Sequence, residues 1–186
     1  MTNIQFGGSR KLAPSYFSEV AQVVSASISN GCAVHVGCAA GADAAVINAA
    51  LCDPFMLRVF AQFSPTGLGS FSGSSVPSVL SAQAAGAHVS FLAGGPLSYP
   101  LKARLIRRSL AALAGCSAAV FFLSNAHSSG SLNVAAAAVK KNIPVYAFSL
   151  GFDGQPALLR SLPGGWQPSH FFGFPCFRWF SGQSLF

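Results

Sequence analysis

Acidic side chains are scarce in this 186-residue sequence, which has only 4 Asp and Glu residues against 11 Lys and Arg. The formal net charge is therefore +7 at pH 7, although charged residues make up only 8% of the chain. So few carboxylates leave no evident pair that could act as general acid and general base. The positive charge points to an anionic partner, such as a nucleotide, a nucleic acid or an acidic lipid, without choosing among them.

Metal-binding and export signals are also absent. Five cysteines, at positions 32, 38, 52, 116 and 176, form no Cys-x-x-Cys pair, and the histidines are scattered, which argues against a zinc site. The N-terminus lacks a basic segment with a long apolar core, and no run of about twenty apolar residues could span a bilayer. We therefore expect a cytoplasmic protein with reduced thiols, no cofactor, no metal and no membrane partner.

With 52% hydrophobic residues and so little charge, much of the surface must consist of small and weakly polar side chains. Such a composition is unusual for a soluble monomer, and it suggests that a second copy of the chain covers part of the apolar surface. We expect a homo-oligomer.

The sequence does contain a regular alternation of short apolar runs and helical periods. The expected strands are residues 4–6, 33–36, 57–61, 88–92, 118–123 and 145–148, and the expected helices are 15–28, 43–51, 79–85, 101–114 and 133–140. Apolar strands that alternate with helices indicate a parallel sheet covered on both faces. The expected fold class is α/β, a Rossmann-like, doubly wound and mostly parallel sheet of about six strands with helices on both faces.

Three turns of small residues follow strands of this predicted sheet. They are Phe6–Arg10 after the first strand, Gly37–Asp43 after the second and Ser128–Val134 after the fifth. A turn that opens a helix leaves backbone N–H groups unpaired, and the helix dipole adds positive charge, so each turn suits a phosphate or a carboxylate. Because ligands of parallel sheets bind beyond the carboxyl ends of the strands, we expect the three turns to meet at one cleft.

Two residues of these turns have competing interpretations. Arg10 either binds a phosphate through its guanidinium or is a solvated charge. Asp43 either caps the second helix or contacts a ribose hydroxyl. The serines at positions 9, 129 and 131 have no nearby histidine with an orienting acid, so no serine nucleophile is expected and no catalytic residue is assigned.

The helix expected over residues 101–114 carries four cations in fewer than two turns, namely Lys102, Arg104, Arg107 and Arg108. At about 100° per residue the three arginines share one face, and we expect the leucines at 101, 105, 110 and 113 to anchor the opposite side. The cationic face is either solvated or an anion-binding surface, and both interpretations stay open.

Residues 151–186 differ in character, so we expect a nucleotide-binding domain over residues 1–150 and a C-terminal extension over residues 151–186. The extension contains an aromatic run, residues 170–180, interleaved with Arg178. The run either packs on the sheet or on a second subunit, or uses Trp179 and its neighbours to stack on nucleic-acid bases.

The ordered set of motifs resembles the SLOG superfamily, a Rossmann-like group that includes the DNA-processing protein A (Smf) family and the lonely guy cytokinin-activating hydrolases. The resemblance covers roughly residues 3–150 and is carried by Gly7–Arg10, Gly37–Ala45, Ser129–Ser131, Ala135–Ala138 and Ile143–Val145. It implies a cleft for a nucleotide or phosphate, faced by Gly8, Ser9, Arg10, Gly41, Asp43, Ser129, Gly130 and Ser131. It also aligns Arg108-Ser109 with an Arg-Asn pair of the superfamily.

The resemblance bears on function as well. The lonely guy enzymes need a glutamate three residues after the Thr of the last turn, where this chain has Val134. Because a valine cannot act as general base, we expect no N-glycosidic hydrolysis. The main expectation is therefore a sensor or binding module for a phosphate-bearing nucleotide. The alternatives are single-stranded DNA binding along Lys102, Arg104, Arg107, Arg108 and Trp179, and a phosphoribohydrolase-like enzyme that uses Asp43.

Overall fold

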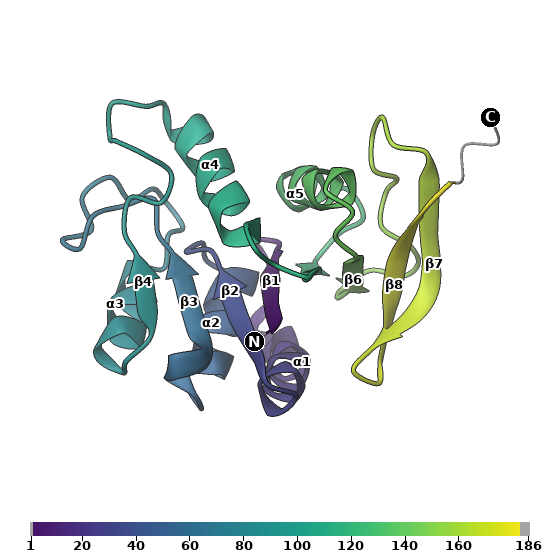
Figure 1. Cartoon of the computed structure of the whole chain (residues 1–186), viewed down its shortest axis with the longest axis horizontal. Coiled ribbons are helices and arrows are strands. Elements are labelled where there is room, and N and C mark those ends of the chain that lie inside the picture. The colour runs from purple at the N-terminus through teal and green to yellow at the C-terminus, as the bar shows by residue number, and fades with distance from the viewer. Residues whose placement is uncertain (1, 183–186) are drawn as a thin grey trace.

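The computed structural model describes residues 2–182 as an α/β fold built on one mixed sheet of eight strands (Figure 1). The strands are β1 (Thr2–Gly8), β2 (Cys32–Val36), β3 (Leu57–Phe60), β4 (His88–Ser90), β5 (Ala118–Leu123), β6 (Val145–Ser149), β7 (Gly164–Phe171) and β8 (Phe174–Ser181). The α-helices are α1 (Phe17–Ser29), α2 (Ala42–Ala50), α3 (Val76–Ala84), α4 (Leu101–Leu113) and α5 (Ser129–Lys140). Single 3-10 turns, η1 (Pro14–Tyr16) and η2 (Pro54–Met56), precede α1 and β3.

The strand order is β4-β3-β2-β1-β5-β6-β8-β7, and every neighbouring pair from β4 to β6 is parallel. The chain moves outward from β1 to β4 and then returns to the other side of β1 at β5. This reversal opens a crevice beside the carboxyl ends of β1 and β5, the usual ligand position in such sheets. The central strands are buried along most of their length, as their apolar sequences predict.

Two hydrophobic clusters cover the two faces of the sheet. One contains Val20, Val24, Ile47, Val79 and other residues from α1, α2 and α3. The other combines Ala135 and Ala138 of α5 with β5, β6 and the C-terminal strands. In Figure 1, α4 and α5 lie above the strands and α1 lies below them, so the crevice is bordered by α4 and α5.

The C-terminal region forms a hairpin, which corrects the expectation of about six strands. β8 adds antiparallel to β6, and β7 pairs with β8 along its whole length at one border of the sheet. The pair Phe171–Phe174 closes the hairpin, leaving Phe172 and Gly173 in the turn with φ of 48° and 87°. Positive φ at both positions is the geometry of a type I′ turn, which usually carries Asn-Gly. The aromatic run thus extends the sheet, while a domain boundary at residue 150 stays a prediction.

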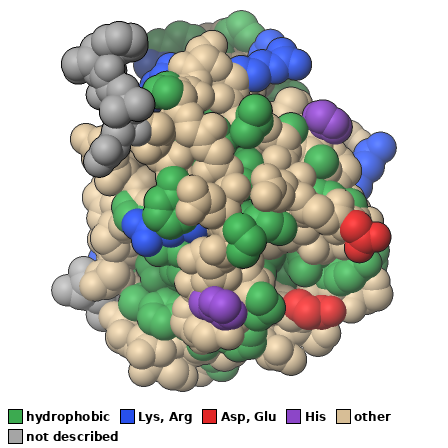
Figure 2. All heavy atoms as spheres, turned by 90° about the vertical axis from the view of Figure 1, so that its right-hand side faces the viewer, with side chains coloured by type: hydrophobic (Ala, Val, Ile, Leu, Met, Phe, Trp, Pro, Cys, Tyr) green, Lys and Arg blue, Asp and Glu red, His purple; other side chains and the backbone are tan. Residues whose placement is uncertain are grey.

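Figure 2 shows the hairpin side of the molecule, where scattered hydrophobic side chains lie among other uncharged residues, with separate Lys or Arg and Asp or Glu side chains between them. Phe172 and Phe180 are about two-fifths exposed here. Such a surface is compatible with the expected self-association, which stays a prediction. Within residues 2–182, no helix is both long enough and apolar enough to cross a membrane.

Candidate anion-binding cleft

A cleft of about 1280 Å³ opens at the carboxyl end of the central strands, between α4 and α5. Its rim includes the turn after β1, the first turn of α5, the start of α4 and residues 71–73 of the loop before α3. No described residue beyond Ala137 contributes to its wall, so the aromatic hairpin does not fill it.

The three small-residue turns converge at this cleft, as predicted. The Ser9 carbonyl accepts a hydrogen bond from the Ala42 N–H at 3.1 Å, which joins the first turn to the second. The Ser9 hydroxyl lies 2.7 Å from the Ser128 hydroxyl and accepts from the Ser124 N–H at 2.9 Å, which joins it to the third. Ser9 therefore connects all three turns.

Close backbone packing explains two of the glycines. A Cβ at Gly8 would overlap the carbonyl oxygen of Phe122, and a Cβ at Gly41 would overlap that of Ser9. Gly41 also has a φ of 72°, which L side chains rarely adopt. Gly41 does not line the cleft; it lets the second turn pack against the first. The other residues predicted for the ligand cleft, Gly8, Ser9, Arg10, Asp43, Arg108 and Ser129–Ser131, all line it.

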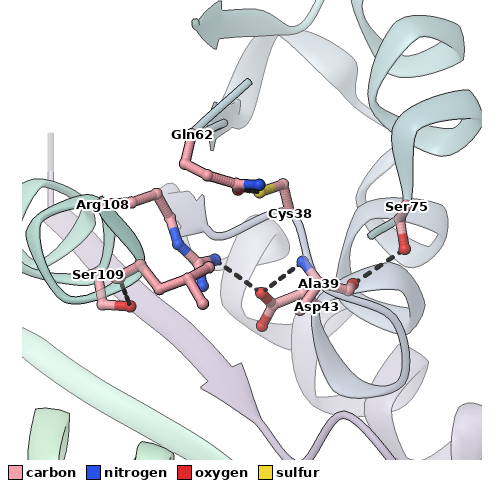
Figure 3. Close-up of polar contacts among 8 residues, drawn as sticks. Cys38, Ala39, Asp43, Gln62, Ser75, Arg108 and Ser109 are labelled. Carbon is pink, nitrogen blue, oxygen red and sulfur yellow. Dashed lines mark hydrogen bonds and ion pairs between the residues drawn. The ribbon is translucent and has the colours of Figure 1, made fainter. Parts of the chain in front are cut away.

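Asp43 and Arg108 form a buried ion pair inside the cleft (Figure 3). The Arg108 Nη1 donates to Asp43 Oδ2 at 3.0 Å, and the same oxygen accepts from the Ala39 N–H at 3.0 Å. A Cβ at Gly37 would collide with the Arg108 guanidinium, so this glycine makes room for the pair. Opposite charges held this close compensate each other. The Asp43 carboxylate therefore offsets most of the attraction that Arg108 would exert on a phosphate.

A network around Cys38 supports the ion pair from the β2 side (Figure 3). The Cys38 thiol donates to Gln62 Oε1, and the Ser75 hydroxyl donates to the Ala39 carbonyl at 2.9 Å. Burial raises the pKa of the Cys38 thiol, partly offset by the nearby Arg108 charge, so this thiol stays protonated and keeps the proton that it donates to Gln62. These contacts fix the loop before α3 against the second turn.

The cations of α4 are distributed differently from the sequence expectation. Arg104 and Arg108 lie on the buried side of the helix, whereas Leu101 is 39% exposed and only Leu113 of the four leucines is fully buried. The expectation that leucines anchor α4 opposite a cationic face was therefore wrong. Arg104 donates to the carbonyls of Tyr99, Gln62 and Gly69 at 3.0–3.2 Å, so it braces the loop over residues 61–75 and offers no exposed charge.

Among the described lining residues, three exposed cations remain on the cleft, namely Arg10, Lys11 and Lys102. The Arg10 guanidinium lies 5.9 Å from the ring of Phe71, and Arg107, outside the cleft, lies 4.6 Å from that of Tyr99. Sequence reasoning missed Lys11, although it directly follows Arg10 in the same turn. Asp43 is the one carboxylate among the described lining residues, and it is already paired.

The third turn is the first turn of a helix. α5 begins at Ser129 rather than at Asn133, so Ser129, Gly130 and Ser131 present N–H groups that have no acceptor within the helix. Ser129 and Gly130 are exposed, and all three residues line the cleft. Together with the helix dipole, this is the local arrangement that suits an anion.

Trp179 lies elsewhere. Its ring is 5% exposed and packs edge-on against Trp166 at a centroid distance of 5.4 Å. Because neither face of a buried ring is free for a base, the packing interpretation describes Trp179 better than the stacking one. Residues 2–182 also contain no group of three or more His, Cys, Asp or Glu side chains that could hold a metal ion.

Comparisons with known proteins give a fold but no close relative. No protein-family model and no curated protein matches the sequence. DNA processing protein A from Streptococcus pneumoniae is 21% identical with a TM-score of 0.62, over 79% of this chain and 50% of that one. DNA processing protein A from Helicobacter pylori, described with a single-stranded DNA binding mode, is 17% identical with a TM-score of 0.61, over 78% of this chain and 64% of that one.

This chain thus spans about half to two thirds of the length of those solved chains. At such low identity the similarity concerns the arrangement of the backbone. The resemblance to DNA-processing protein A noted in the sequence is confirmed at the level of the fold: this chain has the Rossmann-like α/β fold of DNA processing protein A.

Proposed function

We propose that the cleft binds single-stranded DNA through its phosphates, without turnover. The observation that carries this proposal is the charge of the rim. Arg10, Lys11 and Lys102 are exposed there, while the one described carboxylate of the wall is neutralised by Arg108. Exposed cations beside an opening give the sequence-independent part of nucleic-acid affinity.

Two further observations support DNA as the ligand. The net charge of +7 favours association with a polyanion over the whole surface. The H. pylori protein of similar fold is described with a single-stranded DNA binding mode, which supports the same ligand for this chain. Of the four cations that the sequence suggested for a DNA track, Lys102 lies on the cleft and is exposed.

A phosphate-bearing nucleotide is the second candidate, favoured by the first turn of α5. Its free N–H groups lie beside the hydroxyl groups of Ser9 and Ser128, which together suit a single phosphate. In either case we expect no hydrolysis. Val134 lines the cleft where the lonely guy enzymes have their glutamate, and Asp43 is bound to Arg108.

A salt series distinguishes the two candidates. Binding of a fluorescein-labelled 20-nucleotide oligo(dT) is measured by anisotropy between 50 and 300 mM NaCl. If three rim cations contact phosphates, the logarithm of the association constant should fall against that of the salt concentration with a slope of about −2. A mononucleotide pocket should give a much weaker salt dependence.

The matched variants are Arg10→Ser/Lys11→Ser at the rim and Lys140→Ser/Lys141→Ser at the far end of α5. Both remove two exposed charges, so they change the net charge equally. We expect the rim variant to bind at least tenfold more weakly with a slope smaller by about 1.4, because two phosphate contacts are lost. Equal weakening of both variants, or no binding by the native chain at 50 mM NaCl, would overturn the DNA proposal.

A further inference from the structure

A second cavity, of about 230 Å³, lies at the opposite end of α5 from the cleft. The pairing of β8 with β6 ends at Tyr146–Arg178, whereas β8 continues to Ser181. Pro144, just before β6, has no N–H with which to extend this pairing. The two strands separate here, and the cavity lies between them. It is bordered by Val139 of α5 and by residues 142–144 and 178–181.

Two adjacent residues of β8 bring buried N–H groups to this cavity. The Nε of Arg178 and the Nε1 of Trp179 have no hydrogen-bond partner among residues 2–182. Trp179 is 5% exposed, and both residues line the gap between β6 and β8. The other indole, that of Trp166, donates to the Ala157 carbonyl at 3.1 Å. Because buried N–H groups are nearly always paired, two free donors at one cavity point to a ligand that carries acceptors.

The charge around the cavity selects an anion. Within the described part of the chain Arg178 forms no ion pair, and its guanidinium lies 5.6 Å from the ring of Tyr146 and 5.0 Å from that of Phe180. These cation–π contacts hold the guanidinium in place and leave its N–H groups free to donate. Lys140 and Lys141 are exposed at the end of α5 and add positive charge nearby. None of the described lining residues is acidic.

A carboxylate on a short aliphatic stem fits these features better than a phosphate does. The Nε–H of an arginine and the neighbouring Nη–H form a fork that matches the two oxygens of a carboxylate, and an indole N–H donates to a further lone pair. The rest of the wall includes Val139, Ile143 and Pro144, which suit an aliphatic stem. A phosphate dianion brings more negative charge than one partly buried arginine compensates.

We propose that the cavity between β6 and β8 binds a carboxylate group, with Arg178 and Trp179 as its donors. The carboxylate comes from a free aliphatic acid or from a glutamate side chain of another polypeptide, because both present the same group. The site lies about 16 Å along α5 from Ser129, so it does not depend on the DNA proposed for the cleft.

The two indole N–H groups of the chain provide the readout. Proton–nitrogen correlation NMR spectra are recorded while sodium butyrate is added to about 50 mM at constant ionic strength. We expect the Trp179 indole proton to move downfield along a saturating curve, because it gains a charged acceptor. The Trp166 signal should stay in place, because its N–H already donates to Ala157. Butanol and inorganic phosphate, added in the same way, should leave both signals unchanged.

The matched variants are Arg178→Lys and Arg160→Lys. Arg178→Lys keeps the charge and loses the fork, so we expect it to bind butyrate about tenfold more weakly. Arg160→Lys makes the same change at an exposed position outside the cavity and should bind like the native chain. A capped tripeptide, acetyl-Gly-Glu-Gly-amide, distinguishes the two sources. Tighter binding than butyrate assigns the site to a polypeptide, and weaker binding assigns it to a free acid.

The outcomes decide the proposal in either direction. A Trp179 signal that butyrate does not move overturns it. An equal shift with butanol or with phosphate also overturns it, because the cavity would then take any apolar molecule or any anion. A folded Arg178→Lys protein that binds like the native chain overturns the assigned donors. The native titration decides the question even if Arg178→Lys does not fold. Oligo(dT) binding is measured separately, so this proposal and the DNA proposal can fail independently.

Discussion

Buried polar side chains of this protein pair with partners that are distant in the sequence. Asp43 and Arg108 are 65 positions apart, and Arg104 reaches carbonyls 35 and 42 positions away. The sequence assigned Asp43 to the cleft through its position after a strand, and the superfamily resemblance assigned Arg108 to it. The sequence could not predict their mutual pairing, because that depends on how α4 crosses the second turn and on the space left by Gly37.

His35 should make the stability of the protein sensitive to acid. Burial lowers its pKa below the ordinary value of 6.5, and the charges of Arg58 and His88 act in the same direction, partly offset by the hydrogen bond to the Ala112 carbonyl. The unfolded chain therefore takes up a proton at higher pH than the folded one. This contribution to stability is complete above pH 6.5 and is lost as the pH falls through the folded pKa.

The measurement is the free energy of unfolding in urea between pH 5 and pH 7.5. We expect His35→Gln to show a shallower loss of stability with falling pH than the native chain, because its amide takes up no proton. His170→Gln, which replaces an exposed histidine of β7 whose charge is not among those that shift the pKa of His35, serves as control and should keep the native slope. An unchanged slope in His35→Gln would show that other groups dominate the acid response.

At the scale of elements, regular strands and helices followed from the sequence, and the orientation of α4 did not. Hydrophobic periodicity assigns the apolar side of a helix to the core. The N-terminal half of α4, however, lies against the loop over residues 61–75, whose backbone carbonyls need donors. Arginine supplies these donors, so it is buried where leucine was expected. Sequence periodicity carries no information on this local demand.

Replacing Arg104 should therefore destabilise the protein in a way that its exposed neighbour does not. Arg104→Met leaves the carbonyls of Tyr99, Gln62 and Gly69 without their donor, and we expect a loss of about 2–3 kcal/mol in the free energy of unfolding. Lys102→Met removes the same charge from an exposed position, with an expected change within about 0.5 kcal/mol. Similar losses for both, measured by urea unfolding, would contradict the bracing role.

The hairpin of β7 and β8 shows a second limit of sequence reasoning. Its strands contain Gly164, Gly165 and Pro168, which weaken a strand pattern, and its turn is Phe172-Gly173 instead of Asn-Gly. Phe172 adopts a φ of 48° because the cross-strand pairs on either side of the turn fix the register. Those pairs join residues of two different strands, and a sequence does not show which strands will pair. The aromatic run alone therefore indicated packing but not a hairpin.

At the scale of the whole molecule, the hairpin contributes to both hydrophobic clusters. Phe171 and Cys176 belong to the cluster beneath α1, while Trp166 and Trp179 belong to the one beneath α5. Burial raises the pKa of Cys176 to about 11, consistent with an apolar surrounding. An element that completes both faces of a core should unfold together with that core.

This cooperativity can be measured directly, because the sequence has two tryptophans and both lie in the hairpin. Tryptophan fluorescence reports on the hairpin, and far-ultraviolet circular dichroism reports mainly on the helices. We expect both signals to change at the same urea concentration.

Trp179→Ala should lower the free energy of unfolding by about 3–5 kcal/mol in both signals, because it empties a buried site. Phe180→Ala, at a position 39% exposed, should cost about 1 kcal/mol or less. An earlier fluorescence transition would instead identify residues 151–186 as a separable extension, and a chain ending at Leu150 would then keep the native circular-dichroism midpoint.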